Sequence, residues 1–117
     1  MEIAKTPTPP YYAVVFTSQR TDVDSGYNEM SNRMFEIVRK QPGFLRFESV
    51  TDGIVSETPL LGITVYYWKN VDSMKNWKEN SEHIFAQESG KEKWYQSYKI
   101  RICKIERDYE FDKEKES

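Results

Sequence analysis

Few side chains in this sequence are suited to acid–base or nucleophilic chemistry. The chain of 117 residues has one histidine, His83, and one cysteine, Cys103. The unperturbed pKa of histidine, about 6.5, makes His83 the first candidate for a general base near neutral pH. Single copies of the two residue types exclude an internal disulfide and a metal site with two or more histidine ligands. We therefore expect no metal centre. His83 is either the proton acceptor of a site or a structural histidine that is exposed or bonded to local backbone at the end of a helix.

Two further polar candidates lie in residues 98–109, which are predicted to form a strand. Arg101 alternates with Ile100 and Ile102, so it should project from the opposite face of that strand. There it could balance an anionic substrate or form a structural ion pair, including one across a dimer. Cys103 in the same strand is more typical of a small packing residue than of a nucleophile.

Aromatic side chains make up 15% of the chain and are the other group that could form a site. Their rings can stack on a planar ligand, and the N–H of Trp or the O–H of Tyr can bond to its oxygen. The same rings could serve as core packing or as a contact between two copies. Trp94 and Tyr95 follow Gly90, where a short lid over a pocket could lie. The candidate pocket residues are Trp68, Trp77, Trp94, Tyr66, Tyr67 and Tyr95.

His83 is expected on a helix that begins at Asn70 or Asp72 and ends near Gly90. The inward stripe of this helix comprises Met74, Trp77, Ser81, Ile84 and Phe85. On an uninterrupted helix His83 would point away from that stripe. It would then face either a cleft beside the helix or the solvent.

Four strands and two helices are expected to position these residues. Runs rich in β-branched and aromatic residues predict strands at 11–18, 44–51, 62–68 and 98–109. An apolar repeat from Tyr27 to Val38 predicts an amphipathic helix of about four turns, which Gln41-Pro42-Gly43 ends. Residues 52–60 are expected to form a hairpin loop. The order β-α-β-β-α-β predicts an α+β ferredoxin-like sandwich, with an antiparallel sheet and both helices on one face.

The first, third and fourth predicted strands carry apolar side chains on both faces, whereas the helices can cover only one. A bare second face would expose a large apolar patch. The simplest cover is a second copy of the chain, which predicts a homodimer in which two sheets pack face to face as a dimeric α/β barrel.

Length and charge define one domain and exclude several partners. We expect an extended, proline-rich leader at residues 1–10, one domain at 11–109 and a charged, disordered tail at 110–117. The tail accounts for the whole net charge of −2, so the domain has no basic face for nucleic acid or for an anionic membrane. With no signal-like start and no apolar stretch of membrane length, we expect a cytoplasmic protein.

The ordered series of local sequences resembles the antibiotic biosynthesis monooxygenase family of the dimeric α/β-barrel superfamily. The resemblance spans residues 11–109 and is most specific from Gly62 to Tyr95. It is carried by Tyr12-Ala13-Val14-Val15-Phe16, Gln41-Pro42-Gly43-Phe44, Gly62-Ile63-Thr64-Val65 through Trp68, Trp77, Glu82-His83, Ala86-Gln87, Gly90, Trp94-Tyr95 and Arg101.

This resemblance implies a homodimer that oxidises a small electron-rich aromatic or quinol with dioxygen and without a cofactor. His83 would be the catalytic proton acceptor. The substrate-binding residues would be Trp68, Trp94, Tyr95 and Arg101. The alternative is a ligand-binding or stress-response dimer without turnover.

A separate branch of the family binds and opens haem, which gives a second alternative. In that branch the iron-ligating histidine follows an alanine, ten positions after a helical tryptophan. Counting from Trp77 leads to Gln87, which is not an ordinary haem ligand. The sequence Thr17-Ser18-Gln19 also replaces the asparagine of the first strand, so both positions count against haem degradation.

Overall fold

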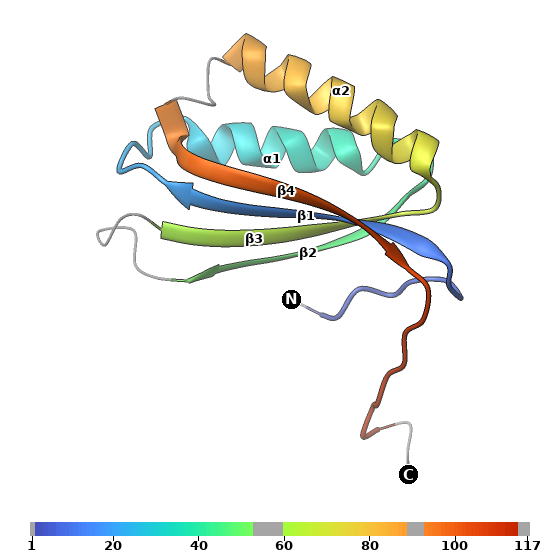
Figure 1. The fold of residues 1–117 in the computed structure, drawn as a ribbon. Helices are drawn as coiled ribbons and strands as arrows, with labels where there is room; N and C mark the ends of the chain where they lie inside the picture. Colours follow the sequence, from blue (N-terminus) through green and yellow to red (C-terminus); the bar gives the residue numbers. More distant parts are fainter. Residues whose placement is uncertain (1, 53–59, 89–92, 115–117) are drawn as a thin grey trace.

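The computed structural model describes residues 2–52, 60–88 and 93–114, with the side chains of residues 82–88 outside the described part. Its six elements follow the predicted β-α-β-β-α-β order. They are β1 (Tyr11–Arg20), α1 (Tyr27–Val38), β2 (Phe44–Asp52), β3 (Leu60–Trp68), α2 (Val71–Glu88) and β4 (Tyr95–Ile105). The strands form one antiparallel sheet in the order β2-β3-β1-β4, and both helices lie on one face of it (Figure 1).

The register of the sheet determines which side chains face the helices. Val14 in β1 pairs with Tyr66 in β3 and with Ile102 in β4, and all three line a cavity beneath the helices. Val15 pairs with Val65 and Arg101 on the opposite, open face, as strand alternation requires. The predicted opposition of Arg101 to its isoleucine neighbours is therefore confirmed.

The fourth strand occupies a different range from the predicted 98–109. β4 begins at Tyr95 because a register shift between Gln19 and Arg20 lets Arg20 pair with Tyr95. It ends at Ile105 because that residue pairs with Tyr11, the first residue of β1, and no strand among the described residues continues beyond it.

The helices pack through the predicted apolar faces as far as these are described, with Met74 and Trp77 buried on α2. α1 has 12 residues, somewhat fewer than four turns, and buries Met30, Met34 and Val38. α2 begins after Asn70, whose side-chain oxygen accepts a 2.8 Å hydrogen bond from the Ser73 N–H, an N-cap arrangement. None of the described helices is both long enough and apolar enough to cross a membrane.

The open face of the sheet is partly covered by the leader, residues 2–10 (Figure 1). The Ala4 N–H donates to Glu48, which also accepts a hydrogen bond from the Tyr67 hydroxyl. The Tyr11 hydroxyl accepts from Thr6 and donates to Asp108. Segments near both chain ends are therefore attached to the same face.

Candidate functional site

A cavity of about 140 Å³ lies between the helices and the covered face of the sheet. β1 and β3 supply its floor through Val14, Phe16 and Tyr66, while α1 and α2 supply its roof, including Met34 and Trp77. These residues meet because the even-numbered positions of the two strands and the apolar stripes of the two helices face one another. The result is a mainly apolar and aromatic enclosure.

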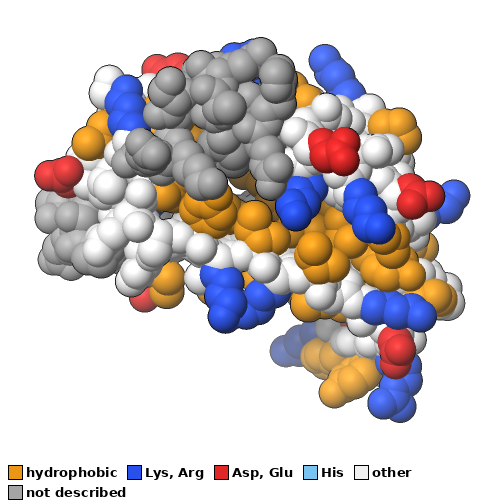
Figure 2. All heavy atoms as spheres, turned by 45° about the horizontal axis from the view of Figure 1, so that its top comes forward, with side chains coloured by type: hydrophobic (Ala, Val, Ile, Leu, Met, Phe, Trp, Pro, Cys, Tyr) orange, Lys and Arg blue, Asp and Glu red, His pale blue; other side chains and the backbone are white. Residues whose placement is uncertain are grey.

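The mouth of the cavity lies along β4, the edge strand of the sheet. Its lining residues Tyr98, Ile100 and Ile102 are exposed, the last by 57%. Lys75 and Lys78 of α2 also belong to the lining. Figure 2 shows a band of hydrophobic side chains bordered by Lys and Arg side chains on the face turned toward the viewer. The cavity thus combines an apolar interior with cationic groups in its lining.

Three tyrosines supply polar groups inside this apolar enclosure. Tyr27, Tyr66 and Tyr95 all line it, and the Tyr95 hydroxyl hydrogen-bonds with that of Tyr27. Burial is the main cause that raises the pKa of Tyr66 and of Tyr95 well above the usual range, and the nearby Tyr27 adds to both shifts. Both phenols therefore stay protonated at neutral pH. The Tyr66 hydroxyl can donate a hydrogen bond to a ligand, and the Tyr95 hydroxyl can do so by turning its proton away from Tyr27.

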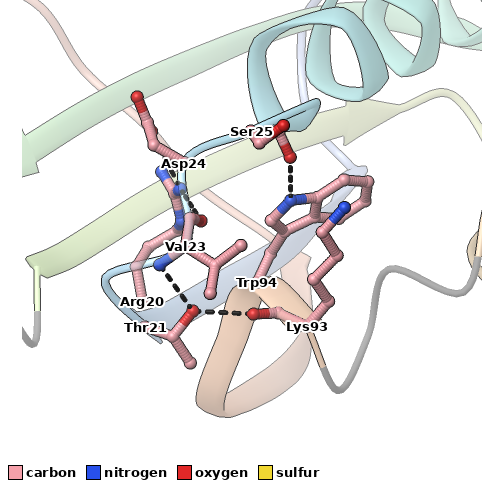
Figure 3. Close-up of polar contacts among 7 residues, drawn as sticks. All are labelled: Arg20, Thr21, Val23, Asp24, Ser25, Lys93 and Trp94. Carbon is pink, nitrogen blue, oxygen red and sulfur yellow. Dashed lines mark hydrogen bonds and ion pairs between the residues drawn. The ribbon is translucent and has the colours of Figure 1, made fainter.

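Trp94 fixes the start of β4 to the loop before α1 (Figure 3). Its indole N–H donates to the Ser25 carbonyl oxygen at 2.9 Å, and its backbone carbonyl oxygen accepts from the Thr21 N–H at 2.9 Å. The Thr21 hydroxyl donates to the Lys93 carbonyl oxygen at 2.7 Å. These bonds hold the two chain segments that carry Tyr27 and Tyr95 side by side.

The structure brings only some of the predicted site residues to the cavity. Tyr95 lines it, as does Trp77. Trp94 is 3% exposed and packs edge-on to Tyr27, so it supports the wall from behind rather than forming a lid. Trp68 has no exposed surface and lies behind Trp77, with ring centroids 6.4 Å apart. Neither residue is part of the lining.

Three other residues that the sequence singled out are not among the described cavity-lining residues. Arg101 lies on the open face and does not line this cavity, because its strand neighbours Ile100 and Ile102 take the inward positions. His83 and Gln87 belong to α2, but their side chains lie outside the described residues. The predicted loop at 52–60 likewise falls largely outside them, apart from its end residues.

Sequence reasoning did not assign Tyr27 to the pocket, because it occupies the apolar stripe of the first helix. It also missed Arg20, which lies behind Tyr27. A signal for Arg20 was available in strand alternation, since Arg20 has the same parity as the inward-facing Val14 and Phe16. A charged residue in register with apolar inward positions indicates a polar site at that end of the strand.

The described lining can bind an aromatic ring and donate hydrogen bonds to it, but it contains no carboxylate or histidine side chain. Nor do any three His, Cys, Asp or Glu side chains within the described residues lie close enough together to hold a metal ion. The proton-transfer capacity of the described wall is thus limited to tyrosine, lysine and hydroxyl groups.

Comparisons with known proteins identify relatives of this chain. It is 44% identical over 105 residues to YqjZ, an uncharacterised protein of Bacillus subtilis, with 90% of this chain and 88% of YqjZ covered. No family model matches the sequence.

Solved structures with the same fold are more distant in sequence. SnoaB, a cofactor-independent oxygenase from Streptomyces nogalater, superposes with a TM-score of 0.66 at 9% identity, covering 86% of this chain and 97% of SnoaB. A candidate antibiotic biosynthesis monooxygenase from Bacillus cereus superposes with a TM-score of 0.58 at 13% identity, covering 88% and 100%.

Proposed function

The chain belongs to the family that includes Bacillus subtilis YqjZ and has the fold of the antibiotic biosynthesis monooxygenases, and from this we propose that it oxidises a small electron-rich phenol or quinol with dioxygen. The observation that carries the proposal is the aromatic cavity of about 140 Å³ beneath the helices. An apolar cavity of about 150 Å³ engineered in another protein binds benzene. The size therefore favours a substrate with one aromatic ring.

The proposed reaction uses the substrate as its own reductant. Loss of the phenolic proton gives a phenolate, which passes one electron to dioxygen. The phenoxyl radical and superoxide combine through a new carbon–oxygen bond at a ring carbon that carries hydrogen. Loss of that hydrogen as a proton and cleavage of the oxygen–oxygen bond give a quinone and one water. Overall, one phenol and one dioxygen give one quinone and one water.

The described side chains have two roles in this proposal. Tyr95 and Tyr66 remain protonated because burial raises the pKa of each, so they can donate hydrogen bonds to the oxygen that becomes negative. The apolar walls exclude water from the radical pair and confine it until the new bond forms. His83 is the proposed proton acceptor, as the histidine of the helix whose residues roof the cavity.

We also propose that the protein is a cytoplasmic homodimer whose two copies meet through the open faces of their sheets. Val15 and Val65 pair at the middle of that face and are only partly buried in the single chain. Arg101 lies beside Val15 in β4 and would then lie at the contact between copies.

Oxygen uptake with a panel of monocyclic phenols and quinols tests the activity. Isotopically labelled dioxygen should place one labelled atom in the quinone formed from a phenol. Tyr95→Phe removes a donor to the developing charge and should lower the rate by about tenfold. Tyr109→Phe, at a fully exposed tyrosine, is the matched control and should keep the wild-type rate. Equal rates for the wild type and His83→Ala, both at the protein-free background, would remove the enzymatic proposal.

A second function, ligand binding without turnover, is favoured by one specific observation. The described lining offers hydrogen-bond donors but no carboxylate or histidine base. In that case phenols would bind and perturb the fluorescence of Trp77, while oxygen uptake would stay at background. The two measurements together separate the two functions.

A further inference from the structure

Arg20 is a buried cation behind the tyrosine end of the cavity. It is only 9% exposed, and its guanidinium carbon lies 3.3 Å from the centroid of the Tyr27 ring. Arg20 also pairs with Tyr95 across β1 and β4. Arg20 thus stacks on the ring of Tyr27 and is the strand neighbour of Tyr95, and both tyrosines line the cavity.

The charge of Arg20 is only partly compensated within the described residues. One guanidinium nitrogen donates to the Val23 carbonyl oxygen and to the Asp24 carboxylate, each at 3.2 Å (Figure 3). The Asp24 side chain is 55% exposed, so solvent screens its negative charge. The Nε of Arg20 is buried and has no hydrogen-bond partner among the described residues. Positive potential therefore remains on the buried side.

This potential acts at the hydroxyl groups that a ligand would meet. Arg20 opposes the effect of burial on the pKa of Tyr95, so its field favours negative charge at that position. The charged groups of the described lining itself, Lys75 and Lys78, are also cationic. A neutral aromatic ligand would gain nothing from this arrangement, whereas an anionic one would.

We propose that Arg20 makes the Tyr27–Tyr95 end of the cavity an anion site, so that the pocket selects a monocyclic phenol in its phenolate form. Arg20 acts as a positioning residue, because it holds Tyr27 by stacking and supplies charge without lining the cavity itself. The inference rests on the proposed function only in taking the cavity as the ligand site. Binding and turnover are measured separately.

The test compares two coloured probes of similar shape, para-nitrophenolate and its neutral methyl ether, para-nitroanisole. Dissociation constants for both are measured at one pH, above the ionisation of the nitrophenol, without any assay of oxygen uptake. Arg20→Met should weaken phenolate binding on the order of tenfold more than it weakens ether binding, as expected for the loss of one unit charge in a partly shielded site. Circular dichroism checks that the variant is folded.

Asp24→Asn is the variant that separates charge from structure. Removing this exposed carboxylate leaves the Arg20 charge less compensated, so the preference for phenolate over ether should rise by about twofold, most clearly at low salt. If Arg20 served only to order the loop, Asp24→Asn would weaken both probes alike. Equal effects of either substitution on the two probes, or a wild type that prefers the ether, would overturn the inference. Failure of the oxygen assay would leave it standing, since a non-catalytic pocket would show the same preference.

Discussion

The indole N–H of Trp94 and the backbone carbonyl oxygen of Ser25 form a 2.9 Å hydrogen bond between segments 69 residues apart in sequence. Trp94 is almost fully buried, and its ring also packs edge-on to Tyr27. This bond ties the start of the edge strand to the loop that leads into α1. The position of Tyr27 in the cavity wall therefore depends on a residue outside the cavity.

Trp94→Phe should lower the free energy of unfolding by about 0.5–1.5 kcal/mol more than Trp68→Phe does, because it removes the hydrogen bond to the Ser25 carbonyl oxygen. Trp68 is the matched control: it is equally buried, but its indole N–H has no hydrogen-bond partner among the described residues. Urea unfolding followed by circular dichroism measures both. Equal losses would show that the Trp94 bond contributes nothing beyond ring packing.

Gly43→Ala should be more destabilising than Gly26→Ala, although both glycines have positive φ angles, 79° and 81°. An alanine Cβ at Gly43 would overlap the Ser73 hydroxyl oxygen, whereas at Gly26 the nearest atom, on Trp94, is 3.2 Å away. We expect about 1–2 kcal/mol for Gly26→Ala from its backbone conformation, and about 3 kcal/mol or more for Gly43→Ala. Thermal unfolding ranks the two.

A double-mutant cycle tests the cause of that ranking. Adding Ser73→Gly to Gly43→Ala removes the clashing side chain and should restore part of the lost stability, leaving the backbone cost. If the double variant loses as much stability as the sum of the losses of the two single variants, the contact with Ser73 does not explain why Gly43→Ala is the more destabilising substitution.

The protein should lose stability at alkaline pH because burial raises the pKa of Tyr66 and Tyr95 in the folded state. The unfolded chain releases these phenolic protons near pH 10, before the folded chain does. Their contribution is therefore complete below about pH 10 and falls above it, by about 1.4 kcal/mol per pH unit for each tyrosine. Urea unfolding at a series of pH values measures this slope.

Tyr66→Phe should make the loss of unfolding free energy above about pH 10 less steep, by about 1.4 kcal/mol per pH unit, which is the contribution of one proton. Tyr109 is fully exposed, so Tyr109→Phe is the control and should leave the slope unchanged. A Tyr66→Phe slope identical to that of the wild type would mean that this phenol ionises in the folded protein as readily as in the unfolded chain.

Val65→Asp should dissociate the proposed homodimer. Val65 lies at the middle of the open face, paired with Val15 on one side and with Glu48 on the other. A new carboxylate buried between two sheets should weaken association by about 2–3 kcal/mol, roughly a hundredfold. Sedimentation velocity over a range of concentrations measures the change, with Val65→Thr as the control of similar size. A monomeric wild type, or a Val65→Asp variant as tightly dimeric as the wild type, would contradict the proposed interface.

The fold was predictable because the residue patterns that determine its strands and helices are local in the sequence. Alternation around Arg101 and the apolar repeat through Met30 and Met34 each extend over a few residues, and both assigned the correct faces. The early start of β4 was not predictable in this way. It depends on the pairing of Tyr95 with Arg20 and on the bond from Trp94 to Ser25, which join distant parts of the chain.

The cavity was less predictable for a related reason. The sequence identifies aromatic residues as a class but does not distinguish a ring that borders space from one that fills it. Trp68 and Trp77 pack against each other, yet only Trp77 borders the cavity. That difference depends on the depth at which α2 lies over the sheet, a property of the assembled layers.

The contacts of Ala4 with Glu48 and of Asp108 with Tyr11 have a practical consequence for handling the protein. A purification tag fused before the leader would extend beside the face on which a second copy is expected to dock. Such an extension could compete with the neighbouring subunit or tether it. Molecular-mass measurements should therefore be made on protein from which the tag has been cleaved, because the tag changes the surface through which two copies would associate.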